Sequence, residues 1–183
     1  MITGHFTTAL VPYAKHKDYP LFYLLLITQI QDLLIPVDLI IQNLTIFDLK
    51  SLQMTYSHDI IPTLIMSILA GIITYLIYKK KDLALWCFGL VIFHEVCDLF
   101  SGFSHNLFGT HTHSFGFDLY RENTLLAGLI ELTLAVACFL FFVWKRKKEE
   151  LPITNNKLII LTIVIFLPIV SMIIMPFFGK TLL

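Results

Sequence analysis

Residues 60–100 read IIPTLIMSILAGIITYLIYKKKDLALWCFGLVIFHEVCDLF. Two apolar runs, Ile60–Tyr78 and Leu83–Phe100, flank three consecutive lysines. Each run approaches the roughly 20 residues with which a helix crosses the hydrocarbon core of a bilayer. Neither run shows the alternation of a β-strand, and helices are then the plausible spanning form. This stretch predicts a membrane helical hairpin whose second helix contains His94 and Asp98.

Three further apolar runs continue the pattern, at Leu21–Ile41, Leu125–Trp144 and Leu158–Phe178. We therefore expect an all-α fold, a polytopic membrane helix bundle of about five spans in a single membrane domain over residues 1–183. The apolar segment Ile2–Tyr13 is too short to span. We expect it to lie on the membrane surface or to enter the bundle as a re-entrant half-helix.

The composition agrees with a membrane protein. Hydrophobic residues make up 57% of the chain and charged residues 14%, whereas a soluble domain is about half apolar and a quarter charged. The formal net charge is zero, and the sequence lacks the clustered basic face of nucleic-acid-binding proteins. The three cysteines lie within apolar runs, which is typical of small buried side chains rather than of a disulfide framework.

The positive charges predict an orientation in the membrane. If the spans alternate, ten of the thirteen basic residues share one side: Lys15, Lys17, Lys79, Lys80, Lys81, Lys145, Arg146, Lys147, Lys148 and Lys157. By the positive-inside rule that side is cytoplasmic. The N-terminus would then be cytoplasmic and the C-terminus outside.

Ionisable residues within the spans are the strongest functional signal, because each costs on the order of 3 kcal/mol on insertion scales. His94 and Asp98 are four residues apart and share one helix face. The pair is suited to binding a metal ion, to locking two helices by a hydrogen bond, or to relaying protons. Asp32 lies in the middle of the first run, where it is either a ligand or a protonated carboxyl bonded to a neighbouring helix.

Two further candidates border the second run. His58 precedes it, either as a ligand or as an incidental neighbour of a helix cap made by Ser57 or Asp59. Asp38 lies nearer the outer end of the first run, where we expect it to be solvated.

The remaining candidates lie further along the chain. Glu131 is in the middle of the fourth run and could support a ligand or bond another helix. His105 follows Asp98 by two helical turns and could reach the same face. His111 and His113 are more typical of pH-sensitive surface groups or a gate.

The order of these elements resembles a family of bacterial membrane-bound proteins described as metal-dependent hydrolases, which includes inner-membrane proteins that bind the SOS-response repressor. The matching elements are Gly4-His5, Ile30–Leu34, Tyr56–His58, Phe93–Asp98, Phe115–Tyr120 and Leu129–Leu132. The resemblance covers residues 1–145 and leaves the run at 158–178 outside. Gln31 replaces the family's usual proline, and Asp59 stands where serine is common. The order also looks like that of the soluble zinc-dependent phospholipase C fold.

The resemblance implies one site that collects His5, Asp32, His58, His94 and Asp98. Three imidazoles and two carboxylates suit a divalent transition metal, zinc or manganese, better than calcium. For this set to converge, the segment with His5 must reach the depth of His94. The candidates for acid–base catalysis are Asp59, His105 and Glu131.

We therefore expect a hydrolase embedded in the bacterial inner membrane that acts on a lipid or lipid-linked phosphoester or ester. One alternative is a metal-ion or proton transporter that uses the same buried residues. Five spans without an inverted repeat are poor transporter architecture, although a homodimer would supply one. Another alternative is a non-catalytic scaffold that binds a partner through its basic loops.

Overall fold

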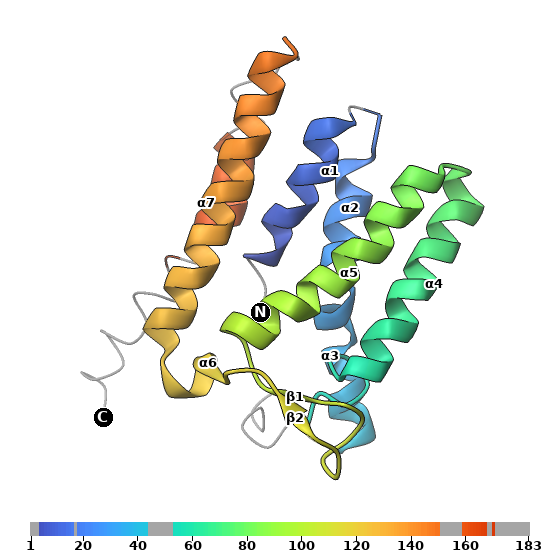
Figure 1. The fold of residues 1–183 in the computed structure, drawn as a ribbon, viewed down its shortest axis with the longest axis vertical. Helices are drawn as coiled ribbons and strands as arrows, with labels where there is room; N and C mark the ends of the chain where they lie inside the picture. The colour runs from blue at the N-terminus through green and yellow to red at the C-terminus, as the bar shows by residue number, and fades with distance from the viewer. Residues whose placement is uncertain (1–3, 17, 44–52, 151–158, 168–169, 171–183) are drawn as a thin grey trace.

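The computed structural model describes residues 4–16, 18–43, 53–150, 159–167 and 170, which form a helix bundle (Figure 1). Its elements are η1 (His5–Ala9), α1 (Leu10–Lys15), α2 (Leu21–Thr28), α3 (Ile30–Ile41), α4 (Ile60–Tyr78), α5 (Lys81–Ser101), β1 (His105–Asn106), β2 (Ser114–Phe115), α6 (Leu119–Glu122) and α7 (Thr124–Lys148). Residues 159–167 are also helical. The all-α prediction is confirmed, since the two short antiparallel strands form only a loop hairpin.

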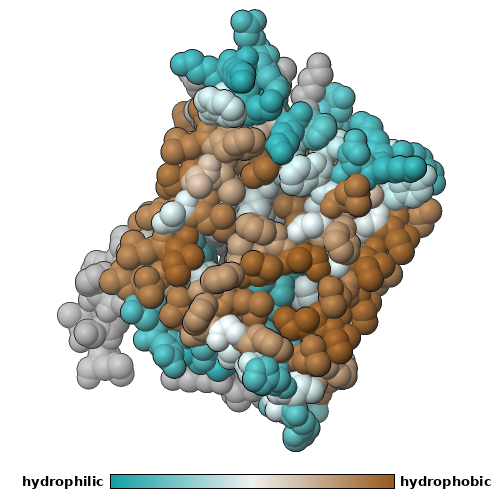
Figure 2. All heavy atoms as spheres, in the orientation of Figure 1, coloured by the Kyte–Doolittle hydropathy of each residue, from teal (hydrophilic) through white to brown (hydrophobic). Residues whose placement is uncertain are grey.

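Three of these helices, α4, α5 and α7, are long and apolar enough to cross a membrane. Figure 2 shows an apolar band around the middle of the molecule and hydrophilic residues at both ends. We call one of these the basic end: it carries the turn between α1 and α2, the turn between α4 and α5, and the C-terminal end of α7 (Figure 1). The described residues are thus compatible with a membrane protein, while the inner membrane and the orientation stay predictions.

The first predicted span is not one straight helix, which corrects the sequence prediction. It breaks at Gln29 into α2 and α3, which meet at a bend of 43°. At the break the carbonyl of Thr28 accepts hydrogen bonds from His94 Nδ1 at 2.6 Å and from the Gln29 side chain at 3.2 Å. Membrane helices tolerate such breaks where neighbouring side chains satisfy the backbone. Counting the bent pair as one span gives up to four candidate spans among the described residues.

Five spans are therefore not confirmed. Of the predicted fifth span, residues 159–167 are helical, and most of the rest lies outside the described residues. The basic residues 145–148 also differ from expectation, because they form the last turn of α7 rather than a loop. Arg146 is mostly buried there, with its guanidinium 4.3 Å from the Tyr13 ring centroid and a hydrogen bond of 3.2 Å to the Tyr13 carbonyl.

The N-terminal segment lies inside the bundle rather than on its surface. Ala9, Leu10 and Ala14 are fully buried, and η1 and α1 contact α2 and α7. In Figure 1, α1 runs upward from the middle of the bundle to the basic end. This placement matches the expectation of a segment that enters the bundle. It also brings η1 into contact with α5.

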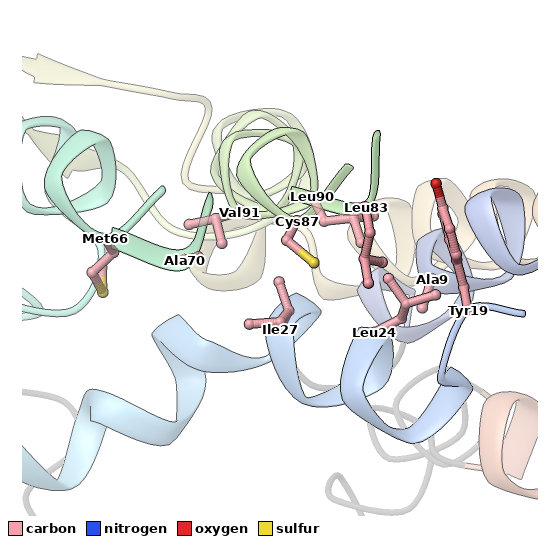
Figure 3. Close-up of a cluster of buried hydrophobic side chains, with 10 residues drawn as sticks. All are labelled: Ala9, Tyr19, Leu24, Ile27, Met66, Ala70, Leu83, Cys87, Leu90 and Val91. Carbon is pink, nitrogen blue, oxygen red and sulfur yellow. The ribbon is translucent and has the colours of Figure 1, made fainter. Parts of the chain in front are cut away.

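Two apolar clusters hold these helices together. The first, shown in Figure 3, joins η1, α2, α4 and α5; its members are Ala9, Tyr19, Leu24, Ile27, Met66, Ala70, Leu83, Cys87, Leu90 and Val91. The second joins α1 to α7 through Leu10, Ala14, Ala135 and Phe142, with Ile165 packed against them. Close packing of this kind drives helix association in lipid. Together the clusters fix the N-terminal segment between α5 and α7.

Phe142→Ala tests whether α7 anchors the N-terminal segment. Phe142 is 2% exposed and its ring stacks on Tyr13 at 5.9 Å, so the cavity should lower the free energy of unfolding by about 3 kcal/mol. Leu140→Ala is the matched control, because Leu140 on the same helix is 60% exposed. Thermal unfolding in detergent measures both. Equal melting temperatures for the two variants would contradict the packing described here.

Candidate metal centre

The five predicted ligands lie together although they come from four separate segments. His5 begins η1, Asp32 lies in the first turn of α3, His58 precedes α4, and His94 and Asp98 lie on α5. The three histidines and Asp98 are at most 2% exposed. The His5 and His94 ring centroids are 4.1 Å apart, which confirms the depth that the sequence required of the N-terminal segment. Their role as ligands stays a prediction.

Asp98 is at the centre of the cluster, because its carboxylate approaches all three imidazoles. Its Oδ1 lies 3.6 Å from His5 Nε2, and its Oδ2 lies 3.5 Å from both His58 Nε2 and His94 Nε2. Asp32 adds a second carboxylate, with Oδ1 3.4 Å from His58 Nε2 and Oδ2 4.0 Å from His94 Nε2. The imidazole nitrogens and carboxylate oxygens are therefore close neighbours, as the donor atoms of a metal site are.

The bond to Thr28 determines the tautomer of His94. A carbonyl can only accept, so His94 Nδ1 carries the hydrogen and a neutral ring presents the Nε2 lone pair to the carboxylates of Asp32 and Asp98. Within the described part of the chain, His94 Nε2 has no hydrogen-bond partner. The Nε2 lone pair and the carboxylate oxygens repel one another unless a cation lies between them, and that cation is either a metal ion or a proton on Nε2. Metal-binding histidines are commonly oriented by such a bond at the other nitrogen.

Asp38 holds the turn that carries His58. Its two carboxylate oxygens accept hydrogen bonds from the backbone N–H groups of Tyr56 and Ser57, at 2.9 and 3.0 Å. Ser57 Oγ lies 2.8 Å from His58 Nδ1, which leaves Nε2 facing the cluster. Asp38 is fully buried, so the expectation of a solvated carboxylate is wrong. From α3 it instead binds the turn before α4.

Glu131 holds the start of the N-terminal segment. Its Oε2 accepts a hydrogen bond from the backbone N–H of Gly4 at 3.2 Å, across 127 residues of sequence. A Cβ at Gly4 would lie 3.0 Å from the Glu131 Cβ, so only glycine fits this approach without displacement. Glu131 thus fixes the residue before His5 and thereby helps to position the His5 ring in the cluster.

The two other acid–base candidates, Asp59 and His105, lie near the N-terminal end of α4. Asp59 accepts backbone hydrogen bonds from Asn106 at 2.9 Å and Gly109 at 2.6 Å, which ties the β1 loop to α4. Burial raises the pKa of Asp59 above its usual value, against the effect of these two donors. The His105 ring stacks on His58 at 5.2 Å, and burial lowers the pKa of His105 to about 3, so this imidazole is neutral.

His111 and His113 do not join the cluster. Both are exposed in the hairpin loop, and the His113 ring packs against Phe115 at 4.8 Å. This agrees with their interpretation as surface groups.

A buried hydrogen-bond network beside the cluster was not predicted. Gln31 Nε2 donates to Thr63 Oγ1 at 2.8 Å and to Glu95 Oε2 at 2.9 Å, and Thr63 also donates to Glu95 at 3.2 Å. The network links α3, α4 and α5. Its signal in the sequence was the polar residue next to a candidate ligand, Gln31 before Asp32 and Glu95 after His94.

The donor atoms lie close enough together to share a metal ion. Two overlapping groups, His5–His94–Asp98 and Asp32–His58–His94, each bring their ligand atoms within 4.8 Å of one another. Ligand atoms of a tetrahedral zinc ion lie roughly 3.3–3.6 Å apart, because each is about 2.0–2.2 Å from the metal. The distances of 3.4–3.6 Å around Asp98 and His58 are close to this spacing. The buried group could therefore hold a metal ion.

Comparison with known proteins adds no assignment: no family model, no curated protein and no solved structure matches the chain. The chemistry of the site must therefore be inferred from its own residues.

Asp38→Ala tests the support behind His58. Removing the acceptor leaves two buried N–H groups unpaired and releases the turn, so metal affinity should fall about 10- to 100-fold. Competition with a fluorescent zinc chelator measures the affinity. Asp38→Asn keeps one acceptor oxygen and should give a smaller loss. Asp18→Ala, at an exposed aspartate of the basic end, is the control. Unchanged affinity in Asp38→Ala would refute this role.

Proposed function

We propose that this protein is a membrane-embedded, metal-dependent hydrolase of a lipid or lipid-linked phosphoester or ester. The observation that carries the proposal is the buried cluster of three imidazoles and two carboxylates inside an apolar bundle. Such groups are costly in a membrane and are usually retained for a function. The donor set favours zinc, with manganese as the other candidate.

His5, Asp32, His58, His94 and Asp98 would hold the ion or ions. A bound divalent ion supplies a water of lowered pKa and polarises a phosphoryl or acyl oxygen. Asp98 lies among the three imidazoles. The hydrogen bond from His94 to Thr28 keeps the Nε2 atom of His94 directed at the cluster. His58 and His94 need little reorganisation, because the Nδ1 atom of each already has a hydrogen-bond partner.

The least buried side of the cluster favours a substrate from the bilayer. Asp32 has a side chain that is 9% exposed, against 3% or less for the other four ligands. The next residue, Leu33, is an apolar side chain that is 59% exposed. A lipid could therefore approach the cluster past α3 without crossing a charged surface.

Of the three acid–base candidates, His105 has the most suitable position. Both oxygens of Asp59 accept backbone hydrogen bonds, and Glu131 is held to Gly4 through Oε2, although its Oε1 has no hydrogen-bond partner among the described residues. The Nε2 of His105 has no hydrogen-bond partner among the described residues, and its ring lies against His58. His105 can therefore bond to a water or a substrate oxygen beside the cluster, while Asp59 and Glu131 act as positioning residues.

Metal content and ester hydrolysis of the purified protein test the proposal together. Elemental mass spectrometry should find near-stoichiometric zinc or manganese in the wild type and none in His94→Ala/Asp98→Ala. A panel of phospholipid, lipid-linked phosphoester and acyl ester substrates should show turnover that the same variant and a chelator abolish. His111→Ala/His113→Ala removes two exposed histidines and is the matched control, which should keep both metal and activity.

Three results would contradict the hydrolase. Metal without turnover, together with metal or proton flux in liposomes, would favour a transporter. No metal even after reconstitution would make the cluster a structural or proton-handling feature. Full biological function in His94→Ala/Asp98→Ala would favour a non-catalytic scaffold.

A further inference from the structure

A charged cleft lies at the basic end of the bundle, far from the metal centre. It has a volume of about 640 Å³ and lies between the turn joining α1 to α2 and the start of α5. Its lining residues include three lysines and two aspartates: Lys15, Lys80, Lys81, Asp18 and Asp82. We call it the basic cleft. It lies at a hydrophilic end of the molecule, beside the apolar band (Figure 2).

An apolar groove begins at the same place. It has a volume of about 570 Å³ and follows the furrow between α4 and α5, which lie side by side in Figure 1. Its walls include Ile68, Ile72, Leu85 and Phe88. Gly71 also lines the groove, where the missing side chain leaves room. Lys81 lines both the groove and the basic cleft, so the two hollows adjoin each other at this residue.

We propose that the basic cleft and the apolar groove together bind one glycerophospholipid. Its phosphate would pair with Lys80 and Lys81, and an acyl chain would lie in the groove along α4 and α5. The site has the two parts of such a lipid in the same order, charged at the bundle end and apolar toward the middle. Asp18 and Asp82 add acceptors for a head group that carries hydrogen-bond donors, such as ethanolamine or glycerol.

Charge favours a lipid over a second protein chain as the occupant. A helix from another copy that covered the groove would also cover the ammonium group of Lys81, and burying a charge without a partner is costly. A lipid phosphate supplies that partner. Lys15 lies 5.1 Å from the Trp86 ring centroid, which adds a cation and an interfacial tryptophan at the same level.

This lipid is separate from the proposed substrate. His58 precedes α4 at one end of the helix, whereas Tyr75 and Lys81 lie at the other. A helix of 19 residues is roughly 28 Å long, so the basic cleft and the histidine cluster lie near opposite ends of the bundle, and the groove extends from the cleft toward the middle. The inference therefore does not depend on the hydrolase proposal and is tested without measuring metal or turnover.

Native mass spectrometry of the full chain in detergent, titrated with phosphatidylglycerol and phosphatidylethanolamine, tests the site. Lys80→Gln/Lys81→Gln should weaken binding about 25-fold, because each lysine near a lipid phosphate contributes roughly fivefold. Lys147→Gln/Lys148→Gln is the matched control, since these exposed lysines lie at the same end on α7, outside the cleft. It should bind as the wild type does.

A second pair of variants tests the groove. Gly71→Leu should fill it and weaken lipid binding, since a Cβ there makes only ordinary contacts, 3.4 Å from the Phe88 Cβ. Gly89→Leu is its control, because a Cβ at Gly89 meets nothing within 4 Å. Diacylglycerol, which lacks the phosphate, and soluble glycerophosphate, which lacks the chains, should both bind weakly.

Several results would overturn the proposal. These are equal lipid binding by all four variants, diacylglycerol that binds as tightly as the phospholipids, and glycerophosphate that saturates the protein at the same concentrations. A wild-type dimer that Gly71→Leu converts to a monomer would assign the groove to a second copy of the chain.

Discussion

The carboxylate of Asp98 approaches three imidazoles, and the arrangement of the bundle depends on that convergence. His94 reaches it from the previous turn of α5, His58 from the turn before α4, and His5 from the N-terminal segment. The break at Gln29 supplies the carbonyl that orients His94, and the burial of η1 and α1 brings His5 to the same depth. Irregular backbone within an apolar bundle is tolerated here because it is buried in protein.

The hydrogen bonds around the cluster explain how so many polar groups remain inside apolar helices. On the outer side, His94 Nδ1 is bonded to Thr28, the turn of His58 to Asp38, and Gly4 to Glu131, whereas neither ring nitrogen of His5 has a hydrogen-bond partner among the described residues. The inward nitrogen atoms, by contrast, face carboxylates. A buried polar group without a partner costs about 1–3 kcal/mol, so a cation at the centre would stabilise the folded bundle as well as provide chemistry.

The two long helices α4 and α5 connect two different environments. Near one end they border the histidine cluster, and at the other they meet at the basic cleft and the apolar groove. The orientation predicted from the positive charges would put the basic cleft on the cytoplasmic side and the cluster toward the outer side. A bound phospholipid would fix the depth of α4 and α5 in the membrane, and thereby the depth at which a bilayer substrate meets Asp32.

The sequence alone determined the helical class, the three long apolar helices and the placement of His94 and Asp98 on one helix face, because hydrophobic runs and a spacing of four residues along a helix are local properties. It also indicated His5, Asp32 and His58, through a short ordered pattern rather than through any contact. The break at Gln29, the buried role of Asp38 and the anchoring of Gly4 by Glu131 could not be read in this way. Each depends on a contact between segments distant in the chain, up to 127 residues for Gly4 and Glu131. Only the tertiary structure decides which backbone groups and side chains meet, because it selects the depth and angle at which the helices pack.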